Sequence, residues 1–192
     1  MMRRFSTPAI AVIAAALAIG APDGVHAAPV PAAAVGIGKI LSDAGFDVPA
    51  KSLESTDFSL ESLGGGPLAL SSLKGKIVFL NFWATWCGPC NIELPSMKAM
   101  YEKLKAKGLE IVAVDLMEDK KTVSDFVKAK KLPFTVLLDT DGRVGGLYGT
   151  EGIPTTFLID RTGKILARKV GIDGPAWDSP KRLALLEKLL AL

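Results

Sequence analysis

Residues 77–90 read IVFLNFWATWCGPC, and they set the interpretation of the whole chain. The first seven form a nearly unbroken apolar run, which is typical of a β-strand buried on both faces. Cys87 and Cys90 follow, and they are the only two cysteines of the 192 residues. After them, apolar side chains recur at spacings of three and four residues, which predicts an amphipathic helix. The cysteine pair therefore lies between a buried strand and the start of a helix.

The position of the two cysteines suits thiol-disulfide exchange. A thiolate attacks a disulfide, and the unpaired N–H groups and positive dipole end of a helix stabilise a thiolate there. Cys87 stands at that end, and Cys90 lies one turn further on, where it can resolve a mixed disulfide. Pro89 suits the first turn, and Gly88 leaves the site open. Two other interpretations of the pair stay open, a purely stabilising disulfide and half of an intersubunit metal site.

Apolar patterns on either side extend this unit into alternating strands and helices. A hairpin with a Gly-Gly-Gly-Pro turn is predicted at residues 58–70. Strands separated by helices imply a parallel core sheet covered on both faces, and the last two strands would form an antiparallel edge. The fold class is therefore α/β, with a central mixed sheet flanked by helices. The other predicted strands are 77–83, 109–116, 134–138, 155–159 and 164–170. One helix is predicted to follow the cysteine pair and to end at Gly108, and the other predicted helices are 122–131, 144–148 and 180–190.

The first 27 residues have the features of an export signal. Arg3 and Arg4 give a basic start, residues 9–21 carry no charge, and residues 25–27 supply a cleavage site. The uncharged run is shorter than the roughly 20 apolar residues that cross a bilayer. We therefore expect cleavage and a periplasmic or other extracytoplasmic location, with an uncleaved membrane anchor as the alternative. Residues 28–57 are expected to be a linker and a poorly defined segment, followed by one domain at residues 58–192.

Composition narrows the classes of function. The formal charge of +3, from 23 basic and 20 acidic residues, is too small to indicate a nucleic-acid surface. The single histidine, His26, lies in the predicted signal, so the mature chain would lack the histidine of a Ser-His-Asp triad or a Cys-His dyad. Two cysteines cannot close a four-ligand zinc site within one chain. We therefore expect no metal, no cofactor and no nucleic-acid partner.

Two motifs resemble the thioredoxin superfamily. Residues 82–90 (FWATWCGPC) resemble its active-site motif, and residues 153–160 (IPTTFLID) resemble its second signature. Residues 90–95 (CNIELP) are similar to the exported TlpA/ResA-like branch, which includes the reductases of cytochrome c maturation. The resemblance covers about residues 58–192. It implies a thioredoxin-like fold in which residues 122–138 form a central helix-strand insertion.

The resemblance also implies roles for single residues. In the family, the proline that matches Pro154 follows a cis peptide bond beside the cysteines, and Ile153 would pair with an extended substrate segment. The acid that matches Glu93 lies on the buried side of the helix and moves protons during exchange. Thioredoxins proper carry a buried aspartate at the position of Asn81. Taken alone, Pro154 could be an ordinary proline at the start of a strand, and Glu93 a solvated residue of the first turn.

These observations together predict an exported thiol-disulfide oxidoreductase that passes electrons from Cys87 and Cys90 to protein disulfides. Trp86, Gly88 and Pro89 are expected to border the substrate. The resemblance implies a protein substrate with a disulfide, with apocytochrome c or a copper-handling protein as candidates, and a membrane-bound electron donor. An oxidant that forms disulfides, a Cu(I) carrier and a thiol peroxidase remain as alternatives.

Overall fold

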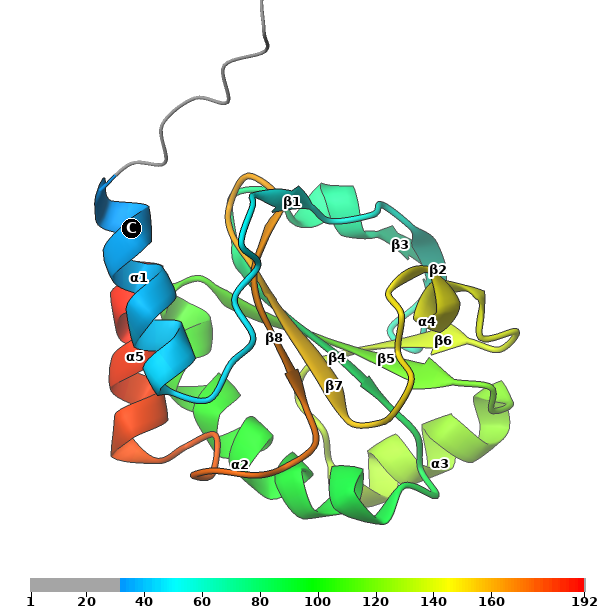
Figure 1. Cartoon of the computed structure of the whole chain (residues 1–192). Coiled ribbons are helices and arrows are strands. Elements are labelled where there is room, and N and C mark those ends of the chain that lie inside the picture. The colour runs from blue at the N-terminus through cyan, green and yellow to red at the C-terminus, as the bar shows by residue number, and fades with distance from the viewer. Residues whose placement is uncertain (1–31, 192) are drawn as a thin grey trace, which may run out of the picture. The chain divides into compact units, whose positions relative to one another are not determined.

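The computed structural model describes residues 32–191, so the predicted export signal lies outside the described residues (Figure 1). The strands are β1 (Leu53–Glu54), β2 (Ser59–Ser62), β3 (Pro67–Ala69), β4 (Ile77–Trp83), β5 (Leu109–Leu116), β6 (Thr135–Asp139), β7 (Thr155–Ile159) and β8 (Lys164–Val170). The helices are α1 (Ala32–Asp43), α2 (Gly88–Leu104), α3 (Lys120–Lys130), α4 (Arg143–Leu147) and α5 (Pro180–Leu190), with short 3-10 turns at η1 (Leu70–Leu73) and η2 (Lys105–Lys107). None of the helices between residues 32 and 191 combines the length and hydrophobicity of a membrane span.

The sheet has the mixed topology that the sequence predicts. Its order is β1-β8-β7-β4-β5-β6-β2-β3, with β4, β5 and β6 parallel and β7 and β8 antiparallel. β4 lies inside the sheet, where Phe79 is in register with Ile111 on one side and with Leu158 on the other. Every residue of β4 is buried, which explains its continuous apolar sequence. One edge differs from the prediction, because β1 pairs with β8 beyond the expected last strand.

The two faces of the sheet are covered by different elements (Figure 1). Side chains alternate along a strand, so Phe79 and Trp83 of β4 face one side and Leu80 and Phe82 the other. The first side packs against α1, α2, α3 and α5. The second packs against the β2–β3 hairpin, η1 and α4, through residues such as Phe58. The predicted hairpin and C-terminal helix are therefore confirmed, and they cover opposite faces of the sheet.

The N-terminal part of the described chain is more regular than its composition suggests. A helix, α1, occupies part of residues 28–57, where a linker and a poorly defined segment were expected. Its residues Ile37, Ile40 and Leu41 recur at helical spacing and pack in the core that α5 also lines, which an alanine- and glycine-rich composition hides. The linker interpretation is corrected for this segment, while the predicted domain boundaries stay a prediction.

Candidate active site

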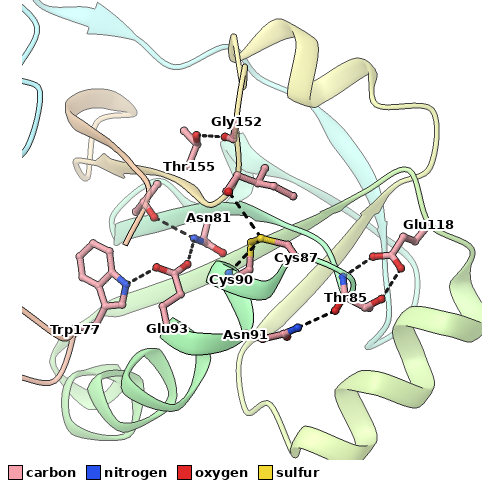
Figure 2. The surroundings of a disulfide bond; sticks show 12 residues. Asn81, Thr85, Cys87, Cys90, Asn91, Glu93, Glu118, Gly152, Thr155 and Trp177 are labelled. Carbon is pink, nitrogen blue, oxygen red and sulfur yellow. Dashed lines mark hydrogen bonds between the residues drawn. A yellow bond between two sulfur atoms is a disulfide. The ribbon is translucent and has the colours of Figure 1, made fainter. Parts of the chain in front are cut away.

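The two cysteines form a disulfide at the point where β4 gives way to α2 (Figure 2). Cys87 is the N-cap of the helix, and its sulfur accepts a hydrogen bond from the backbone N–H of Cys90 at 3.2 Å. Pro89 lies in the first turn, where its missing N–H has no consequence. The sulfur of Cys87 therefore lies at the positive end of the helix, where a thiolate is stabilised.

The surface around the pair is open on one side. Cys90 is completely buried and Cys87 is only 4% exposed, whereas Gly88 and Pro89 are exposed beside them. Trp86, which directly precedes Cys87 in the chain, is 66% exposed. The disulfide is therefore accessible at Cys87 and shielded at Cys90.

The loop that precedes β7 lies against the disulfide. The Ile153–Pro154 peptide bond is cis, as the resemblance implied. The carbonyl oxygen of Ile153 lies 3.8 Å from the sulfur of Cys87. Thr155 supports this loop through a hydrogen bond from its hydroxyl to the carbonyl of Gly152 at 2.6 Å. The two signatures predicted from the sequence, separated along the chain, thus meet at one site.

Glu93 lies behind the cysteines, inside the protein. It is 6% exposed, which excludes the interpretation of a solvated residue in the first turn. Asn81 donates a hydrogen bond to one carboxyl oxygen at 2.9 Å, and the indole N–H of Trp177 donates one to the other at 2.9 Å. Burial raises the pKa of Glu93, and the hydrogen bonds from Trp177 and Asn81 oppose that rise without cancelling it. The carboxyl is therefore placed to exchange a proton closer to neutrality than an ordinary glutamate.

Two buried cations, which the sequence did not reveal, lie near this carboxyl. Arg182 is 1% exposed and stacks on the rings of Trp177 and Phe46, with its guanidinium carbon 4.4 and 4.8 Å from their centroids. Lys169 is also buried, and it lines the same cavity of about 180 Å³ as Glu93 and Arg182. Their positive charges favour the ionised form of Glu93 and moderate the rise of its pKa.

Glu118 holds the loop just before the cysteines, on the side of the disulfide opposite to Glu93. Figure 2 shows Glu93 and Glu118 on opposite sides of the disulfide. Glu118 accepts hydrogen bonds from the backbone N–H and the hydroxyl of Thr85, at 2.6 and 2.5 Å. The side-chain amide of Asn91 donates to the carbonyl of Thr85 at 2.9 Å.

Within residues 32–191, no group of three or more His, Cys, Asp or Glu side chains is arranged to hold a metal ion.

This combination of fold and site defines a class of protein. A Cys-Gly-Pro-Cys disulfide at a helix start, between a buried strand and a cis-proline loop, is the arrangement of a thioredoxin-like thiol-disulfide oxidoreductase. The chain belongs to the AhpC/TSA family, whose sequence pattern matches residues 53–168.

Comparisons with known proteins agree with this class. The thiol-disulfide oxidoreductase ResA of Bacillus anthracis is 44% identical over 118 residues, which cover 62% of this chain and 68% of that protein. A putative thiol:disulfide interchange protein DsbE from Chlorobium tepidum superposes with a TM-score of 0.63 at 40% identity, covering 73% of this chain and 96% of its own. StoA from Bacillus subtilis superposes with a TM-score of 0.57 at 30% identity, covering 67% and 96%. The chain is a thiol-disulfide oxidoreductase, and its substrates are proteins that contain disulfides.

Proposed function

We propose that this oxidoreductase works outside the cytoplasm as a reductase of protein disulfides. The observation that carries the proposal is the depth of the site. Cys87 borders the exposed surface, whereas Cys90 and the carboxyl of Glu93 lie buried behind it. This order suits an attacking thiol in front, a resolving thiol behind it, and a proton acceptor in the interior.

The reaction takes two exchanges. In the reduced protein, the Cys87 thiolate attacks one sulfur of the substrate disulfide, so a Cys87–substrate bond forms and the other substrate sulfur leaves as a thiolate. Cys90 then loses its proton and attacks the sulfur of Cys87, which releases the second substrate sulfur and forms the Cys87–Cys90 disulfide. Counted from its dithiol form, the protein gives up two electrons and two protons, one when Cys87 ionises and one from Cys90. The two substrate thiolates take up two protons in turn, so the substrate leaves as a dithiol.

Glu93 supplies the proton transfer for the second exchange. It follows Cys90 by three residues on the buried side of α2, where water cannot easily accept the thiol proton. Because burial raises the pKa of Glu93, the carboxylate becomes a stronger base than an exposed glutamate at neutral pH. The proton can later return to solvent through the cavity that Glu93 lines beside α2.

The substrate segment binds across the exposed side of the pair. Trp86 offers an exposed aromatic surface, and Gly88 and Pro89 carry no bulky side chain above the sulfur. Ile153 and Pro154 form the opposite border, where the backbone of Ile153 can pair with an extended segment. These five residues fit a main-chain mode of recognition that tolerates many substrate sequences.

The reducing direction has a measurable consequence, the redox potential of the pair. Gly88 and Pro89 are the residues that thioredoxin also carries between its cysteines, and any negative charge on Glu93 disfavours the thiolates. We expect a potential below about −200 mV, on the side of thioredoxin at about −270 mV. Equilibration of the purified protein with glutathione or dithiothreitol buffers measures it. A value close to about −120 mV, as in strong periplasmic oxidants, would overturn the reducing direction and favour disulfide formation.

Export and partners complete the proposal. The basic start and short uncharged run of residues 1–27 support secretion with cleavage after Ala27. An oxidising compartment would keep the pair as a disulfide, so a membrane-bound donor must supply electrons. Apocytochrome c and copper-handling proteins are the candidate substrates, by resemblance to the branch. The intact mass of the protein isolated from the cell envelope is expected to begin at Ala28, and a retained Met1 in the membrane fraction would favour an anchor instead.

A further inference from the structure

A second carboxyl beside the active site lies buried and is not used by the mechanism above. Asp115 is near the end of β5, in register with Trp83 of β4, and it is completely inaccessible to solvent. Within the described chain, neither of its carboxyl oxygens receives a hydrogen bond. A buried carboxylate without donors is very costly, whereas a protonated carboxyl is itself a donor. The surroundings of Asp115 therefore favour its neutral form.

Glu118, three residues further along the chain, is the candidate acceptor for such a proton. The backbone has a left-handed conformation at Met117, with φ 58°, and Glu118 beyond it reaches Thr85. Thr85 donates both its N–H and its hydroxyl to Glu118, which a carboxylate can accept. Burial raises the pKa of Asp115 to about 8, and the nearby carboxyl of Glu118 adds to that rise.

We propose that Asp115 keeps its proton at neutral pH and donates it to the Glu118 carboxylate, and that this acid pair positions the active-site loop. Thr85 lies two residues before Cys87, and its carbonyl accepts from Asn91, which directly follows Cys90. The pair thus fixes the segment that enters the disulfide and, through Asn91, the segment that leaves it. Asp115 and Glu118 are positioning residues, because neither contacts the sulfur atoms.

The charges around the pair make ionisation of Asp115 disruptive. Glu118 is the charged group that acts on Asp115, and it has the same sign. The neighbouring side chain of β4 is Trp83, which packs on Phe126 of α3, and neither ring titrates. The residue of α2 that bonds the loop, Asn91, is uncharged as well. When Asp115 loses its proton, the two neighbouring carboxylates repel each other, and the hydrogen bonds from Thr85 to Glu118 weaken.

The test uses the oxidised protein, in which the disulfide cannot titrate. Carbon NMR of the side-chain carboxyls should show Asp115 titrating near about pH 8. The backbone amide of Thr85 should change its chemical shift in the same step, and its protection from hydrogen exchange should fall by about tenfold above it, as expected for loss of a charge-assisted hydrogen bond. The proposal would be overturned if Asp115 titrated in the ordinary pH range of an aspartate. It would also be overturned if the chemical shift and exchange protection of the Thr85 amide did not change when Asp115 titrates.

Two substitutions separate the pair from a merely structural residue. In Asp115→Asn the side-chain amide can donate to Glu118 at every pH, so the Thr85 step should vanish while its protection at neutral pH stays. In Asp115→Leu no donor remains, so that protection should fall at neutral pH too. Asp125→Asn, an exposed acid of α3 that pairs with Lys121, serves as the control and should keep the step. A step that persists in Asp115→Asn would contradict the proposal, and the wild-type titration decides if the leucine variant does not fold.

The catalytic consequence of the pair rests on the proposed function, whereas its titration does not. In the reduced protein, the alkylation rate of Cys87 should show the Asp115 step as an additional inflection that Asp115→Asn lacks. If Asp115 did not titrate near pH 8, the predictions for the redox potential and for electron transfer by the cysteines would still stand. A potential in the oxidant range would, in turn, leave the titration of Asp115 unaffected.

Discussion

Replacement of Cys87 by serine is expected to abolish disulfide reduction, with a loss of at least about a thousandfold, because the hydroxyl cannot replace the attacking thiolate. Cys90→Ser should behave differently, since Cys87 still attacks but nothing resolves the product. The second variant should therefore accumulate a mixed disulfide with its substrate while turnover stops. Reduction of a small disulfide-containing protein measures the first effect, and the mass of the covalent adduct measures the second.

The two variants also act as controls for each other. Only Cys87 stands at the helix N-cap with a backbone N–H on its sulfur, and Cys90 is completely buried. The remaining thiol of Cys90→Ser should therefore react faster with an alkylating reagent at neutral pH than the thiol of Cys87→Ser. Faster modification of Cys90, or an adduct attached through Cys90, would reverse the two roles. The adduct formed in cell extracts would also name the substrate.

Glu93→Gln is expected to slow reduction at neutral pH by roughly ten- to a hundredfold, through loss of an interior proton acceptor. Glutamine fits the same space and can still accept from Asn81, but it cannot take up a proton and it loses one acceptor for Trp177. The pH dependence of Cys87 alkylation should therefore change shape in the variant. Stopped-flow alkylation across the neutral range measures it.

The same substitution has a consequence for stability, with a definite sign. The pKa of Glu93 is raised in the folded state, so the folded protein binds this proton more tightly than the unfolded chain. The stabilisation is complete below the unfolded pKa and is lost as the pH rises through the folded pKa. Glu93→Gln should remove that part of the pH dependence of the free energy of unfolding. Glu102→Gln, at an exposed position of the same helix, should alter neither profile; an equal change in both variants would argue against a special role of Glu93.

The strands were predictable because a strand that is buried on both faces of the sheet has a continuous run of apolar residues in its sequence. The bounds of β4, β5, β7 and β8 match the sequence prediction residue for residue. In contrast, α1 was missed because its alanines and glycines resemble a linker, and its helical form depends on packing against α5 and β8. The composition of a short segment does not reveal the contacts that it makes with residues far away in the sequence.

The site was predictable where chemistry and motif coincide. The cysteine pair follows from its position between strand and helix, and the cis bond before Pro154 follows from the resemblance. Trp177 and Glu118 were missed, because they lie 84 residues from Glu93 and 33 residues from Thr85, in segments without a periodic pattern. Only the folded chain brings these residues to the two sides of the cysteines.

One measurement tests the central claim most directly. Fully reduced protein is mixed with an equal amount of a substrate protein that carries a single disulfide, and mass spectrometry after acid quenching counts the thiols of both. The account predicts that the substrate gains two thiols for each Cys87–Cys90 disulfide formed, and that the reverse mixture, oxidised protein with reduced substrate, transfers little. Two results together would contradict the reductase function. In one, the oxidised protein efficiently forms the disulfide of the reduced substrate; in the other, the reduced protein fails to reduce the disulfide of the oxidised substrate.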